Sequence, residues 1–272
     1  MVLEGAGRAR TVPARRWPLL RVTLWYELAA VAAWIAVIAL TAAGAVHGLH
    51  PAAPAAAPAD ETAHHHVTPA HPPHGAPAPG TVGFGSLAMW MLMCVAMMLP
   101  AALPALAHVG ENSLRRCRQR AMAGFAAVYL TVWTGYGALL LVTAPLWSRP
   151  PGHAVAAGAL ALAAAWQLTV HKRRALRDCH RSSPLPLSGP RAAVGTVRFG
   201  LRHGGACLRS CWALMAVMAA AGGGGAMLAW MALLTGIVMA ERFAAGPGRA
   251  TRLAAGVLAA AVLAVALTPA AA

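Results

Sequence analysis

The sequence predicts an all-α protein, a polytopic bundle of about seven transmembrane helices whose amino terminus is cytoplasmic. Hydrophobic residues make up 59% of the 272 residues and charged residues 11%, well below the roughly 25% of a soluble domain. Long apolar runs recur along the chain, and the arginines cluster between them, as membrane topology requires. A chain of this composition buries its surface in lipid and between its own helices.

Seven apolar segments account for the predicted helices. A spanning helix needs about 20 residues, with a range of about 17–25. The fourth and fifth segments are the shortest by this measure. The segments are 24–46, 83–109, 121–146, 154–170, 206–221, 226–243 and 253–271.

The basic residues fall on one side of the membrane if the segments alternate in direction. They lie before the first segment, then between the second and third, the fourth and fifth, and the sixth and seventh. Arg149 alone falls on the other side. Cytoplasmic loops carry the excess of Lys and Arg, so the amino terminus is predicted inside and the carboxyl terminus outside. The formal charge of +15 is explained by topology, and no nucleic-acid partner is expected.

The segments divide the chain into four parts. Residues 1–23 are a basic cytoplasmic segment, and residues 24–46 are the first transmembrane helix, a possible signal anchor. A cleaved signal peptide is the alternative, because basic residues, an apolar run and small residues follow one another here. Residues 47–82 form an external loop rich in His, Pro and Ala, which cannot bury a core and is expected to be disordered. Residues 83–272 form a six-helix membrane core.

Sulfur side chains concentrate in the second segment, in the stretch "MWMLMCVAMMLP" at residues 89–100. A helix turns by about 100° per residue, so these side chains form two rows. The rows are Met89, Met93 and Met97, and Met91, Cys94 and Met98. Pro100 cannot donate a hydrogen bond to the carbonyl of Ala96, and Pro104 repeats this break one turn later. The helix is therefore expected to kink, and the freed carbonyls need other partners.

The fifth and sixth segments carry further sulfur at helical spacing. In the fifth segment, four sulfur side chains lie within about 80° of one another around the helix. They are Cys207, Cys211, Met215 and Met218. Met227 and Met231 lie one turn apart in the sixth segment, and four glycines at 222–225 join the two segments in a hairpin. We expect these stripes to face each other and the rows of the second segment.

The residue types point to a soft metal ion. His, Met and Cys all bind copper, and thioethers and thiolates select Cu(I). Zinc is less favoured, because it prefers Cys and His to Met. The histidines of the external loop fit metal capture. The candidate metal ligands are Cys207, Cys211, Met215, Met218, Met93, Cys94, Met97, Met98, Met227, Met231, His64, His65, His66, His71 and His74.

Each pattern also has a simpler interpretation. Met fills irregular gaps in a helix core, small Cys residues permit close helix contact in membranes, and the His-rich loop can be a linker of biased composition. Cys117 and Cys179 are expected to be lone thiols in the inner loops. Glu241 is expected to pair with Arg242 or an inner-loop arginine. No Asp or Glu lies at the centre of a predicted helix, which argues against a carboxylate proton relay.

Four stretches of the chain resemble a known family: "WMLMCVAMMLPAALP", "WQLTVHKRRALRDCHRSSP", "GACLRSCWALMAVM" and "WMALLTGIVMAER". Over residues 83–260 the chain is similar to a bacterial family of predicted metal-binding integral membrane proteins, a domain-of-unknown-function family. The resemblance implies metal binding within the membrane. The family's Cys-x-x-Cys-Cys-Trp pattern reads "CLRSCW" here, with Ser210 at an expected cysteine. Its Met-Asn-Leu-x-Trp-Met block reads "AMLAWM", with Ala226 and Met227 at the first two positions.

These observations predict a multi-pass protein of the inner or plasma membrane that handles Cu(I), by transport or delivery. Its expected partners are the lipid bilayer and a metal-delivery or membrane protein. The alternative is a structural or assembly protein whose Met residues are packing. An enzyme is not expected, since the sequence has no P-loop, HExxH or GxSxG motif. The sequence predicts neither the direction of movement nor the oligomeric state.

Overall fold

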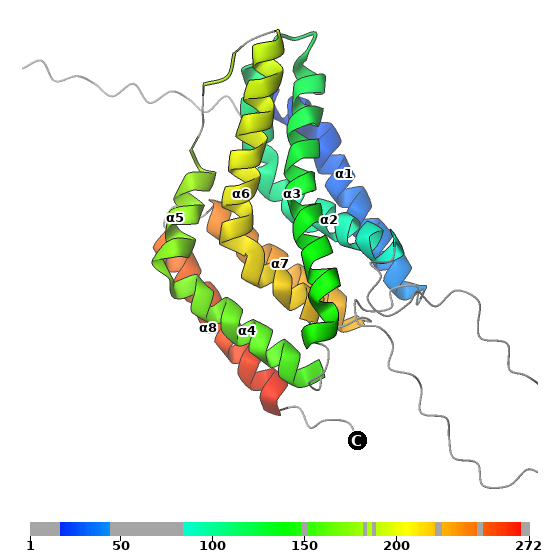
Figure 1. Cartoon of the computed structure of the whole chain (residues 1–272), viewed down its shortest axis with the longest axis vertical. Helices are drawn as coiled ribbons and strands as arrows, with labels where there is room; N and C mark the ends of the chain where they lie inside the picture. Colours follow the sequence, from blue (N-terminus) through cyan, green and yellow to red (C-terminus); the bar gives the residue numbers. More distant parts are fainter. Residues whose placement is uncertain are drawn as a thin grey trace, which may run out of the picture.

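The computed structural model describes residues 17–43, 84–147, 152–181, 184–186, 189–220, 225–243 and 247–267. These residues form eight α-helices (Figure 1). The helices are α1 (Trp17–Ala42), α2 (Phe84–Glu111), α3 (Arg118–Trp147), α4 (Gly152–Leu168), α5 (Val170–Cys179), α6 (Pro190–Ala220), α7 (Gly225–Phe243) and α8 (Pro247–Leu267). The all-α prediction is confirmed, and the expected number of helices fits approximately.

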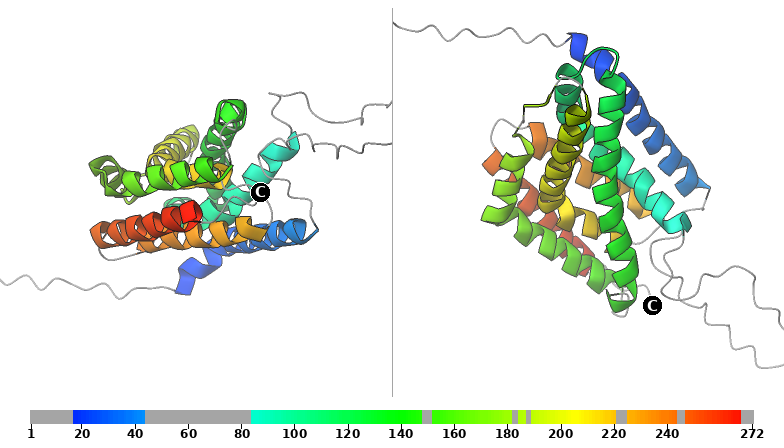
Figure 2. Two further views of the ribbon diagram at one scale, coloured as in Figure 1. Left: turned by 90° about the horizontal axis from the view of Figure 1, so that it is seen from below. Right: turned by 45° about the horizontal axis from the view of Figure 1, so that its top comes forward.

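The helices pack in two layers with α2 between them. Seen from below, α1, α7 and α8 form one layer, and α3, α4, α5 and α6 form the other (Figure 2). α2 contacts α1, α3 and α7, whereas α6 contacts α3, α4, α5 and α7. The two helices with the most contacts are therefore α2 and α6, which also carry most of the candidate sulfur ligands.

The described helices include five that are long and apolar enough to cross a membrane, and the bent pair of α4 and α5 is a sixth candidate. The five are α1, α2, α3, α7 and α8. Large apolar side chains on the outside of the bundle, such as Ile35, Leu139 and Leu263, are 62%, 57% and 63% exposed, as lipid-facing residues are. The chain is thus a multi-pass membrane protein, and its cytoplasmic amino terminus stays a prediction.

α4 and α5 meet at a bend of 73°. Thr169 lies at the bend in an extended conformation, and its hydroxyl accepts a hydrogen bond from the Lys172 amide at 3.1 Å. This N-cap starts α5 in a new direction. The prediction that the basic stretch after residue 170 is a loop was wrong. It forms an amphipathic helix that buries Lys172, Leu176 and Cys179 and turns its arginines outward.

α6 is longer than the apolar segment that predicted it. It begins at Pro190, directly after Gly189, whose φ of 81° suits glycine. The first half of α6 was missed because it is amphipathic, with buried Phe199 and His203 alternating with exposed arginines. Those arginines also explain why α6 is absent from the five apolar spans. Cys207, which the predicted segment 206–221 placed at the start of its helix, consequently lies past the middle of α6.

Small residues bring α3 and α6 into close contact. A Cβ placed on Gly200 would lie 3.0 Å from the Val128 side chain, and one on Gly204 would lie 3.2 Å from Val132. Two glycines one turn apart let helix backbones approach closely in a membrane. This approach places the middle of α6 directly against α3.

The Ala96 carbonyl in α2, which was expected to need a hydrogen-bond donor, has one. The indole Nε1 of Trp34 in α1 donates to the Ala96 carbonyl at 3.0 Å. Pro100 leaves that carbonyl without its usual helical donor. The bond satisfies the freed carbonyl and fixes α1 against α2.

Candidate metal centre

The candidate sulfur ligands of α2, α6 and α7 lie in one buried core. Each of these side chains is exposed by 4% or less, and all belong to the same cluster of contacting residues. They are Met93, Cys94, Met97, Met98, Cys207, Cys211, Met215, Met218, Met227 and Met231. The three stripes are thus gathered inside the bundle and none faces lipid. Their role as ligands stays a prediction.

Cysteines from two helices interact directly within this core. The side chain of Cys207 lies beside those of Cys179 and Cys211. Cys94 of α2 lies close enough to Cys207 for an electrostatic interaction. All four are free, buried cysteines. We call Cys179, Cys207 and Cys211 the thiol cluster.

The prediction that Cys179 is a lone loop thiol was wrong. It is the last residue of α5, it is 5% exposed, and it contacts both Cys207 and Ser210. The signal was present in the sequence: Lys172, Leu176 and Cys179 share one face at helical spacing. Cys117, by contrast, is exposed as expected.

Two hydroxyl groups lie within hydrogen-bond distance of the thiols of α6. The Tyr129 hydroxyl donates to the Met98 carbonyl at 3.1 Å and lies 3.1 Å from Cys207 Sγ. The Ser210 hydroxyl donates to the Cys207 carbonyl at 2.8 Å and lies 3.2 Å from Cys211 Sγ. In both thiol–hydroxyl contacts either atom can be the donor. Hydroxyl groups rotate, so the same pair can donate to a thiolate.

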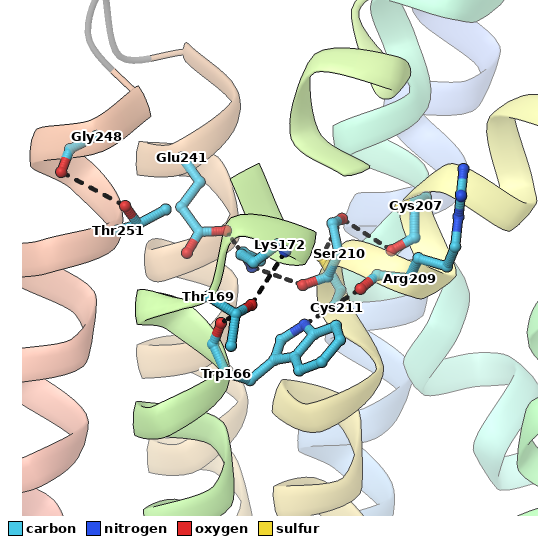
Figure 3. Close-up of polar contacts among 10 residues, drawn as sticks. All are labelled: Trp166, Thr169, Lys172, Cys207, Arg209, Ser210, Cys211, Glu241, Gly248 and Thr251. Carbon is cyan, nitrogen blue, oxygen red and sulfur yellow. Dashed lines mark hydrogen bonds and ion pairs between the residues drawn. The ribbon is translucent and has the colours of Figure 1, made fainter. Parts of the chain in front are cut away.

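Side chains from three helices hold the stretch of α6 that carries the cysteines, and Figure 3 shows two of them, Trp166 and Lys172. Each donates to a main-chain carbonyl of α6, in addition to the helix's own bonds. The donors are Trp166 to Arg209 at 3.2 Å, Lys172 to Ser210 at 2.6 Å, and Tyr136 to Trp212 at 2.8 Å. The positions of Cys207 and Cys211 are therefore fixed from α3, α4 and α5 together.

A buried ion pair lies beside the thiol cluster. Lys172 Nζ is 2.7 Å from Glu241 Oε2, with side chains 0% and 1% exposed (Figure 3). The expectation that Glu241 pairs with an arginine was wrong. α5 turns Lys172 toward α6, where it also interacts with Cys211. The pair joins α5 to α7, and Lys172 joins both to α6.

Arg242 adds a second buried positive charge. It is 8% exposed and interacts electrostatically with Cys207, Cys179 and Cys211. Partial burial and the Arg242 guanidinium lower the pKa of His180, at the end of α5, below its ordinary value. The His180 imidazole is therefore neutral at neutral pH. The thiol cluster thus has two cations near it, Lys172 and Arg242.

The methionines form a different environment, which we call the thioether region. It consists of Met93, Met97, Met98, Met215, Met218, Met227 and Met231, all within the apolar core. Within the part of the chain that the structure describes, no three or more His, Cys, Asp or Glu side chains form a group suited to a metal ion. Thioethers and pairs of thiols are not groups of this kind. A soft ion held by two thiols, with or without methionine, is compatible with this finding.

The histidines of the external loop lie outside the described residues. His64, His65, His66, His71 and His74 fall in the stretch from 44 to 83. Their role in metal capture stays a prediction.

Comparison with known proteins places the chain in a family. Residues 87–265 match a family described as PpoB2, copper chaperone. The chain belongs to this copper chaperone family. No curated protein and no solved structure matches it. Family membership indicates a copper-related function, in agreement with the predicted metal-related bacterial family and with the predicted choice of copper.

The copper chaperone match covers the part of the chain that contains the thiol cluster. It begins in α2 and ends in α8, so it includes Cys94, Cys179, Cys207 and Cys211. α1 and the His-rich loop precede it. The helices from α2 to α8 are therefore the part that the family shares.

Proposed function

We propose that this protein holds Cu(I) at the thiol cluster inside the membrane bundle and passes it on, as a chaperone and not as an enzyme. The observation that carries the proposal is the contact of Cys207 with both Cys179 and Cys211 in a buried core. Thiolates are the ligands that select Cu(I), and family membership supports copper as the cargo. Cys207, at the centre of the cluster, is the proposed common ligand.

The surrounding charges suit this cargo. A thiol must lose its proton to bind a metal, so Cu(I) with two thiolates carries one net negative charge. A buried charge of that kind needs a compensating partner. Lys172 and Arg242 supply positive charge near the cluster, and the Tyr129 and Ser210 hydroxyls can rotate to donate to the thiolates.

The thioether region supplies a weaker second set of ligands. Met93, Met215, Met218, Met227 and Met231 lie in the half of their helices that the predicted topology places outside. Cys94, in the same core, lies near Cys207. We propose that Cu(I) passes between thioethers and the thiol cluster, with the His-rich loop as a capture segment outside. By this account the protein resides in the inner or plasma membrane and hands its cargo to a partner protein.

The test is copper retention by purified protein. Protein loaded with Cu(I) under reducing conditions and desalted is expected to retain a stoichiometric amount. The Cys207→Ser and Cys211→Ser variants should lose it, whereas Cys117→Ser, which removes an exposed thiol, should retain it. Equal retention by all variants, or none by the wild type, would return the sulfur residues to a packing role.

A further inference from the structure

A small cavity lies beside the thiol cluster. It has a volume of about 110 Å³, and its lining includes Cys179, His180, His203 and Arg242. A single water needs only roughly 10–15 Å³ of such space. The cavity therefore has room for a small organic group, next to one of the proposed copper ligands.

Arg242 lines this cavity and carries two buried N–H groups without a hydrogen-bond partner among the described residues. Its side chain is 8% exposed, and within the described part of the chain its Nε and Nη2 atoms have no hydrogen-bond partner. These two N–H groups lie on one edge of the guanidinium and form the fork that matches the two oxygens of a carboxylate. His203 Nε2, also in the lining, is buried and likewise without a partner among those residues. Buried polar groups of this kind are normally paired, so the cavity suits a polar ligand.

A wider groove leads to the cavity. It has a volume of about 580 Å³ and shares Arg181, Phe199 and His203 with the small cavity. Arg202 and Arg209 also line it. Its one carboxylate, Asp178, is already paired with Arg209 at 3.3 Å and Arg181 at 3.8 Å. The approach to Arg242 is therefore positively charged and suits an anion.

We propose that the cavity binds the carboxylate of a small thiol that carries Cu(I), which positions the copper-bearing sulfur beside Cys179 and Cys207. This inference rests on the proposed function and names the donor. The carboxylate sits on the Arg242 fork, and the copper–sulfur bond of the donor breaks as a bond to a cluster cysteine forms. The proton of that cysteine leaves with the donor sulfur, which departs as a thiol. Copper stays Cu(I), so no oxidant or reductant is needed.

The first test compares two donors on the wild-type protein. Cu(I) is supplied as its complex with N-acetylcysteine or with N-acetylcysteine amide, which has the same thiol and no carboxylate. Copper on the protein is measured over time after rapid desalting. If the donor carboxylate binds the two N–H groups of Arg242, copper transfer should be at least about tenfold faster from the carboxylate donor. Excess acetate should slow that transfer. Stoichiometric uptake at equal rates would overturn this inference and leave the proposed function standing. No uptake from either donor would overturn both.

The second test distinguishes binding by the paired N–H groups of Arg242 from attraction to its positive charge alone. Arg242→Lys keeps the positive charge but lacks the fork, so the rate advantage of the carboxylate donor should fall to about twofold or less. Arg249→Lys, at an exposed arginine of α8, is the matched control and should keep the full advantage. An undiminished advantage in Arg242→Lys would contradict the proposed site. The wild-type donor comparison remains decisive if Arg242→Lys does not fold.

Discussion

The thiol cluster and the thioether region lie in the same buried core but differ in what surrounds their sulfur atoms. Cys207 and Cys211 have hydroxyl partners at 3.1 and 3.2 Å and a buried ion pair beside them. The methionines are surrounded by apolar side chains. Burying polar and charged groups costs free energy unless they are paired, whereas Met fills gaps without that cost. The difference indicates a specific arrangement at the thiols, whereas the methionines also serve the packing of the core.

Removing the lysine of the ion pair should have the largest effect on stability. Lys172→Ala leaves Glu241 charged and buried and removes the bond to the Ser210 carbonyl. Breaking a buried pair in this way typically costs about 3–5 kcal/mol. Thermal unfolding in detergent should show this loss for Lys172→Ala.

The matched control removes both charges. In Lys172→Met with Glu241→Leu, no buried charge is left unpaired, so much of the lost stability should return. If the double variant is as unstable as Lys172→Ala, the pair is not what stabilises this side of the bundle.

Overpacking the contact of α3 with Trp90 of α2 should have a smaller effect, and both substitutions that test it are in α3. A Cβ on Gly137 would overlap the ring of Trp90, which is fully buried and donates to the Trp133 carbonyl at 2.9 Å. Gly137→Ala should therefore destabilise the protein by about 1–3 kcal/mol. Gly135→Ala in the same helix meets nothing within 4 Å and should not destabilise it. Unfolding midpoints that fall equally for both would argue against close α2–α3 packing at Trp90.

A cysteine at position 210, where the resemblance implies one, should strengthen copper binding. The Ser210 side chain contacts Cys179 and Cys211, so a thiol there would extend the cluster. Ser210→Cys is expected to raise Cu(I) affinity about tenfold, the lower end of the range over which ligand surroundings act. Competition with a Cu(I) chelator measures this change, and Ser86→Cys, near the other end of the bundle, is the control. A gain of the same size in Ser86→Cys would mean that any added thiol binds copper.

Much of the fold was readable from local patterns. The helices follow from apolar runs, and the sulfur stripes face inward as their periodicity requires. The carbonyl of Ala96 was expected to need a partner because of Pro100, and Trp34 supplies it. These features depend on residues close together in the chain.

The rest depends on tertiary contacts. Cys179 becomes part of the cluster only because α4 and α5 bend at Thr169 and turn α5 against α6. The same bend places Lys172 next to Glu241. No local pattern specifies that a basic stretch will fold back, so the sequence could suggest the faces of α5 but not their partner.

The most direct measurement of the account is Cu(I) affinity for two variants side by side. One is Cys207→Ser, and the other is Met215→Leu with Met218→Leu, which keeps the volume of the core. The account predicts that Cys207→Ser loses at least as much affinity as the roughly 10–100-fold seen for changes around a metal site, and that the methionine variant loses about threefold or less, since thioethers are the weaker ligand set. A large loss in the methionine variant with little change in Cys207→Ser would contradict the claim that the thiol cluster holds the copper.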